Sequence, residues 1–99
     1  MRLYLAAGPS ALHSLRDGQS VTLPAFAAAS EDEEDEFAAL EAAAESGPVV
    51  VADVDEVDPG DEQTVTLDQV VALHVDVDGS GDLAWFATQE IDDVLALLS

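Results

Sequence analysis

The feature that most constrains the fold of this chain is the run Val49–Ala52, which contains three consecutive valines. β-Branched side chains favour strands, and an apolar run without polar alternation is typical of a strand in the middle of a sheet. Gly47 and Pro48 stand directly before this run, and the acidic segment 53–63 follows it. The run therefore predicts a buried central strand with a turn or loop at each end.

Apolar periodicity predicts two further elements. Residues 71–77 alternate, with Val71 and three more apolar side chains on one face, and this period of two predicts a strand. The acidic run 31–36 precedes a modest apolar stripe that begins at Phe37 and continues at helical spacing. We expect a helix there, because carboxylates in a first turn are favoured by the helix dipole.

The C-terminal pattern and the alternation of elements indicate the fold class. Apolar residues at helical spacing predict one last helix over residues 83–98. Strands that alternate with helices favour an α/β (or α+β) arrangement. We expect a single small acidic domain spanning residues 1–99, with a single-layer sheet of about three to four strands and about three helices. The pattern leaves open whether helices cover one face of the sheet or both.

The charge of the chain excludes several classes of function. The sequence has 22 Asp and Glu residues, two Arg, no Lys and a formal net charge of −20. Such a chain repels nucleic-acid phosphates and anionic membranes, so we expect neither as a direct partner. The absence of Lys excludes a P-loop and a Schiff-base lysine, and the absence of Cys excludes disulfides and zinc–thiolate sites.

The N-terminus does not have the pattern of a secretory signal. Its apolar run is very short and is interrupted by Gly8 and Pro9. Nowhere does an apolar run approach the roughly 20 residues that span a bilayer. We therefore expect a cytoplasmic protein.

The segment 76–87 partly matches a calcium-binding EF-hand loop. Its oxygen-bearing side chains are spaced as the loop requires, and the weak candidate metal ligands are Asp76, Asp78, Ser80 and Asp82. Position 12 of the loop is Ala87, where a bidentate Glu should complete the coordination shell. The residues fit a turn better than a calcium site, and we expect no metal or cofactor.

Two pairs of residues are candidates for catalysis. Asp53 and Asp55 follow a strand as the paired carboxylates of haloacid-dehalogenase phosphotransferases do, but the chain has no Lys and is short after them. His74 and Asp76 share one face of a predicted strand, where an acid–base pair needs a pocket. Both pairs are better explained as surface carboxylates and a strand histidine, so we expect a non-enzymatic protein.

Several segments resemble an uncharacterised family of small actinobacterial proteins. The resemblance depends on the opening residues 1–5, the acidic helix, the segments 49–54 and 72–76, and above all the Trp-aromatic-Ala-Thr-Gln-Glu segment 85–90. The family carries no established activity, so the resemblance implies no catalytic residues. It does imply candidate partner-binding residues, which are Trp85, Thr88, Gln89 and Glu90.

The sequence thus favours a protein-interaction or regulatory module that binds an unidentified protein partner. The alternative is an acidic, DNA-mimic-like inhibitor of a basic nucleic-acid-binding protein, since the run 31–36 could imitate a phosphate backbone. A weak calcium-binding module through loop 76–87 is the third interpretation.

Overall fold

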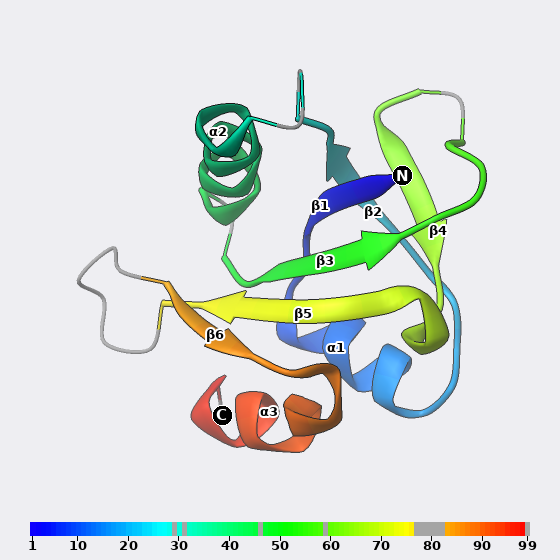
Figure 1. Ribbon diagram of the computed structural model, residues 1–99. Helices are drawn as coiled ribbons and strands as arrows, with labels where there is room; N and C mark the ends of the chain where they lie inside the picture. The colour runs from blue at the N-terminus through cyan, green and yellow to red at the C-terminus, as the bar shows by residue number, and fades with distance from the viewer. Residues whose placement is uncertain (29, 31, 46, 59, 77–82, 99) are drawn as a thin grey trace.

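A six-stranded antiparallel sheet forms the middle of the molecule in the computed structural model, which describes residues 1–28, 30, 32–45, 47–58, 60–76 and 83–98 (Figure 1). The strands are β1 (Arg2–Ala6), β2 (Val21–Phe26), β3 (Val49–Asp53), β4 (Glu62–Val65), β5 (Val70–Val75) and β6 (Ala84–Phe86). They follow the order β4-β2-β1-β3-β5-β6 across the sheet, and every neighbouring pair is antiparallel. The fold is therefore α+β, because its helices do not connect parallel strands.

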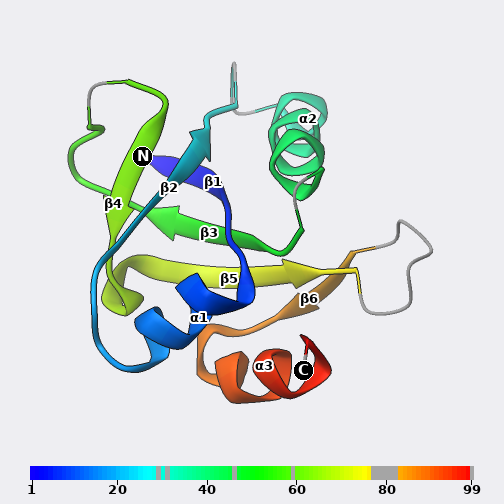
Figure 2. The same cartoon turned by 180° about the vertical axis from the view of Figure 1, so that it is seen from behind.

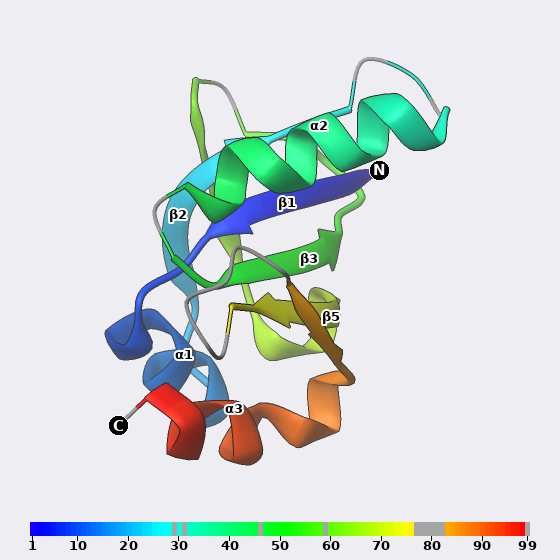
Figure 3. The same ribbon diagram turned by 90° about the vertical axis from the view of Figure 1, so that its left-hand side faces the viewer.

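Helices cover both faces of the sheet, which answers the question that the sequence left open. Helices α1 (Pro9–Arg16) and α3 (Ile91–Leu98) contact each other and pack on one face, whereas α2 (Glu33–Ala44) lies on the other (Figures 2 and 3). Two short 3₁₀ turns, η1 (Leu67–Gln69) and η2 (Thr88–Glu90), precede β5 and α3.

The core confirms the predicted central strand. Val50 and Ala52 of β3 face the larger apolar cluster on the side of α1 and α3, whereas Val49 and Val51 face the smaller cluster under α2. All four side chains are buried. The two clusters differ in what the helices supply, because α1 and α3 contribute leucine, isoleucine and valine, while the buried residues of α2 are Ala39 and Ala43.

The C-terminal segment corrects two predictions. The expected helix over residues 83–98 is wrong in its first half, because Ala84–Phe86 forms β6, and α3 begins only at Ile91. The sheet is also larger than the expected three to four strands. The first error has a clear cause, and it accounts for one of the additional strands. Trp85 and Phe86 fit the helical spacing of their neighbours, while aromatic side chains also favour strands when a partner strand is available. Pairing with β5 supplies that partner.

Candidate functional site

Helix α2 leaves part of its own side of the sheet uncovered. It packs on β1, β2 and β3, and Figure 1 looks onto this side, where no helix passes in front of β5 and β6. We call the uncovered area and the adjoining side of α2 the open face. Its residues are Arg2, Tyr4, Glu33, Glu36, Phe37, Leu40, Val51, Val71, Ala72, His74 and Trp85.

Strand register brings the side chains of the open face together. Trp85 of β6 lies opposite His74 of β5, and Val51 of β3 lies between Tyr4 of β1 and Ala72 of β5. Side chains directly opposite in an antiparallel pair share a face and are about 5 Å apart at Cβ. Residues from four strands therefore form two adjacent rows on one surface.

A register shift between β3 and β5 adds Val71 to this surface. The pairing steps from Val51–Ala72 to Ala52–Val70, so that Val70 joins the larger core cluster and Val71 is exposed. The sequence placed Val71 on the same face as the buried apolar residues of its strand. That expectation is wrong, because a bulge inserts one residue and changes the alternation of faces.

Two aromatic side chains of the open face are exposed to water. Trp85 is 60% exposed and Phe37 is 58% exposed. The sequence placed Phe37 in the apolar stripe of its helix, but the buried positions of α2 are Ala39 and Ala43. Small side chains allow α2 to approach the sheet closely, and Phe37 then lies at the side of the contact instead of within it.

Two open hollows meet in the middle of the open face. One, of about 230 Å³, extends from Tyr4 and His74 toward Val71 and Trp85. The other, of about 270 Å³, extends from the same two residues toward Phe37 on α2. Both hollows are open to solvent, so this surface suits contact with a larger partner better than enclosure of a ligand.

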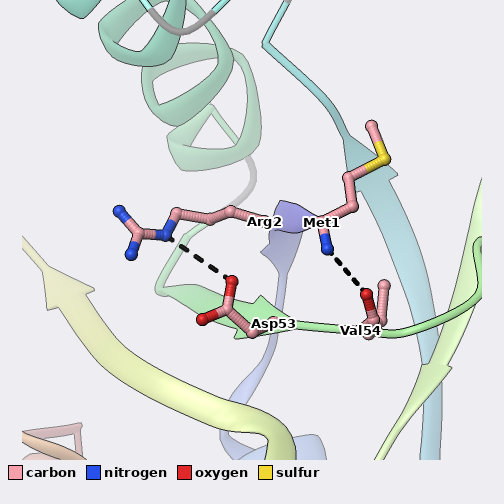
Figure 4. A network of polar contacts seen from close by, with 4 residues as sticks. All are labelled: Met1, Arg2, Asp53 and Val54. Carbon is pink, nitrogen blue, oxygen red and sulfur yellow. Dashed lines mark hydrogen bonds and ion pairs between the residues drawn. The ribbon is translucent and has the colours of Figure 1, made fainter.

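Carboxylates border one end of the open face, and a paired arginine borders the other. Glu33 and Glu36 of α2 line the hollow that contains Phe37, whereas Arg2 lines the hollow that contains Trp85. The Arg2 Nε atom lies 3.9 Å from Oδ1 of Asp53 (Figure 4). The open face therefore carries more negative than positive charge.

The two titratable groups in the middle of the open face are held uncharged. Burial raises the pKa of the Tyr4 hydroxyl, and the negative charge of Glu36 raises it further, against a smaller opposing effect of Arg2. Burial lowers the pKa of His74. At neutral pH both side chains are thus neutral, and His74 is partly exposed whereas Tyr4 is buried.

A third hollow lies where β1 begins and β3 ends. It has a volume of about 570 Å³ and brings Glu36 of α2 and Asp53 of β3 to one place, together with Arg2 and the N-terminus. The N-terminal ammonium group donates a hydrogen bond of 2.7 Å to the carbonyl oxygen of Val54, which fixes this end of β1 (Figure 4). Two acid-rich segments that are far apart in the sequence therefore meet here.

The four predicted partner-binding residues have different environments. Trp85 belongs to the open face. The Thr88 hydroxyl donates a hydrogen bond of 2.8 Å to the Val70 carbonyl oxygen, and the Glu90 carboxylate accepts one of 2.9 Å from the Ala87 amide. Gln89 is exposed on η2. Two of the four thus join the C-terminal turn to the sheet or close that turn.

The predicted calcium loop is only partly described. Asp78, Ser80 and Asp82 lie outside the described residues. Asp76 borders a hollow together with Glu41 of α2 and Glu45, which directly follows this helix. His74 and Asp76 therefore line different hollows. In the part of the chain that the structure describes, no group of three or more His, Asp or Glu side chains is arranged to hold a metal ion.

The sequence interpretation missed the contributions of Tyr4, Phe37 and Val71 to this surface. Phe37 carried one usable signal, since an aromatic residue stands out on a helix that is otherwise rich in Ala. Tyr4 and Val71 carried none, because their places depend on pairing between strands that are distant in the sequence.

Comparison of the chain with protein-family profiles, with curated proteins and with solved structures gives no match. The resemblance to the small actinobacterial family therefore stays a prediction. Within the described residues, each helix is too short or too polar to cross a membrane.

Proposed function

We propose that this protein is a small non-enzymatic protein-binding module, and that the open face is its contact surface. The observation that carries the proposal is the exposure of Trp85, which is 60% exposed on a sheet face while smaller apolar side chains nearby are buried. Trp and Tyr are enriched among the residues that dominate the affinity of protein interfaces. A partner that covers Trp85 and Phe37 would remove two aromatic surfaces from water.

The arrangement of the open face supports a macromolecular partner. The rows on β1, β3, β5 and β6 are held by strand pairing, so little conformational entropy is lost when they are covered. Exposed aromatics at both ends and neutral Tyr4 and His74 between them give an apolar centre with a charged border, which is the usual anatomy of an interface.

This function is tested by whether the immobilised protein retains a partner protein. We expect a partner that wild type retains to be lost by Trp85→Ala and weakened by Phe37→Ala. Truncation of an anchoring aromatic typically costs about 2 kcal/mol or more, which is roughly 30-fold in affinity. The matched control is Leu97→Ala, because Leu97 is also exposed, at 54%, but belongs to α3 on the opposite side of the sheet.

The contradicting result is equally specific. Retention that is unchanged in Trp85→Ala and Phe37→Ala, with both variants folded by circular dichroism, means that the open face is not the contact surface. If the Leu97→Ala control loses the partner equally, the retention depends on non-specific hydrophobic binding and not on the open face.

The acidic-inhibitor function is the second candidate, and the third hollow favours it. There Asp53 lies together with Glu36, the last of the four consecutive acids in the first turn of α2. If this function applies, the retained partner binds duplex DNA, and the chain displaces that DNA. Displacement should then depend on the carboxylates of α2 and not on Trp85.

A further inference from the structure

The two hollows of the open face form one trough with unlike ends. Tyr4 and His74 line both hollows, so the hollows join at these two side chains. Trp85 stands at one end of the trough and Phe37 at the other. Glu33 and Glu36 border the Phe37 end, which therefore combines aromatic surface with two carboxylates.

The cations of this chain balance these carboxylates only in part. Arg2 and the N-terminal ammonium group border the third hollow together with Glu36, but neither lines the hollow that contains Phe37. The two arginines are in ion pairs with other acids, Arg2 with Asp53 at 3.9 Å and Arg16 with Asp92 at 3.6 Å. The sequence contains no Lys. His74 stays neutral at pH 7 because burial lowers its pKa. A positive group that enters the Phe37 end thus meets a negative field.

An arginine side chain matches this end better than other cations. Its guanidinium group is planar, stacks on aromatic rings and pairs with carboxylates through two parallel hydrogen bonds. A lysine ammonium is a compact, strongly hydrated charge that uses only the electrostatic part of the site. A second copy of this chain is disfavoured as occupant, because two molecules that each carry a charge of −20 repel one another.

We propose that the trough binds an arginine side chain from a docking segment of the partner protein, an inference that rests on the proposed function. The guanidinium stacks on the exposed ring of Phe37 and pairs with Glu33 or Glu36. Apolar residues beside that arginine cover Val71 and Trp85. Charge complementarity selects the segment, and the aromatic side chains hold it.

Selection from a displayed library of random peptides on the full chain tests the arginine site. We expect the selected peptides to carry an arginine next to apolar residues. The best peptide is then synthesised with arginine, with lysine and with citrulline, which has the shape of arginine without its charge. Trp85 is the single Trp of the chain, so its fluorescence reports binding directly. Citrulline should weaken binding at least tenfold, and lysine should fall between.

A pair of double variants assigns the effect to the trough. In Glu33→Gln/Glu36→Gln, replacement of arginine by citrulline should change the affinity less than threefold, because the partner carboxylates are gone. The control Asp68→Asn/Asp93→Asn removes the same charge at exposed positions on η1 and α3. In that control the full citrulline penalty should remain.

The failures of the two proposals are distinguishable. Selected peptides that lack arginine, or that tolerate citrulline, overturn the arginine site, as does a library that yields no binder. If such peptides still lose affinity in Trp85→Ala, the protein-binding function stands. Peptides whose affinity is independent of both Trp85 and Phe37 contradict the function itself.

Discussion

The cross-strand pair Trp85 and His74 gives the open face an uncharged aromatic centre. Direct pairing between β5 and β6 places the indole beside the imidazole. His74 is half-buried under this arrangement, and burial lowers its pKa. The neutral imidazole is thus part of the apolar centre of the open face, although it remains a group that acid can charge.

Acidification should destabilise the fold through His74. Because its folded pKa lies below the ordinary 6.5, the unfolded chain binds the proton more readily. The stability contributed by neutral His74 is therefore full above about pH 6.5 and is lost as the pH falls through the folded pKa. Urea unfolding at pH 7.5 and 5.5, in salt that screens surface carboxylates, should show a loss that His74→Gln reduces.

His13→Gln is the control for the unfolding experiment, because His13 lies in α1 on the other side of the sheet. NMR titration of the His74 ring gives the same information directly. A His74 midpoint above 6.5 would refute the assignment, since it would mean that the surrounding carboxylates outweigh burial.

Among the elements, the turn from β6 to α3 directly follows the strand that carries Trp85. Thr88 and Glu90 make hydrogen bonds of 2.8 and 2.9 Å, the first of which joins η2 to the backbone of β5. The Thr88 bond holds η2 next to the beginning of β5, and the Glu90 bond closes the turn itself. The turn therefore has a structural role, and a partner that contacts it must leave these hydrogen bonds in place.

Thr88→Val should lower the free energy of unfolding by about 1–2 kcal/mol, because it leaves the partly buried Val70 carbonyl without this donor while preserving side-chain shape. Gln89→Ala, at an exposed neighbouring position, should stay within about 0.5 kcal/mol of wild type. Urea denaturation measures both. Equal stability of the two variants would show that the Thr88 hydrogen bond contributes nothing.

Only part of the fold and of the open face could be predicted from the sequence. The central strand β3 was predicted because three consecutive valines suffice to mark it. β6 was missed because three residues are too few to show a period of two, and their apolar side chains also fitted a helical spacing. Of the open face, only Trp85 was predicted as a partner residue. The rest depends on register between distant strands, on a bulge at Val71 and on the small buried residues of α2.

At the scale of the whole molecule, the charge of −20 has more than one role. The first turn of α2 carries four consecutive acids, where the helix dipole favours them, while Asp53 at the end of β3 lies near the N-terminus. Together they repel one another, so the fold is stable in spite of its charge and not because of it.

Salt should therefore stabilise the protein. The Debye length falls from about 30 Å at 0.01 M ionic strength to about 10 Å at 0.1 M, so moderate NaCl screens most of the repulsion. We expect the melting temperature to rise by about 5 °C or more as the ionic strength increases from about 0.01 M to 0.1 M and above. A variant with Gln or Asn at positions 33–36 should show a smaller rise. A melting temperature that is flat or falls with salt would contradict this account of the charge.

Quenching of the single Trp by acrylamide, a neutral quencher, tests the claim that the open face is a contact surface anchored by Trp85. In the free chain we expect Trp85 to be quenched readily, as its 60% exposure requires. In the complex with the retained partner it should become protected. Protection already present in the free chain, or quenching that is the same with and without the partner, would contradict the claim.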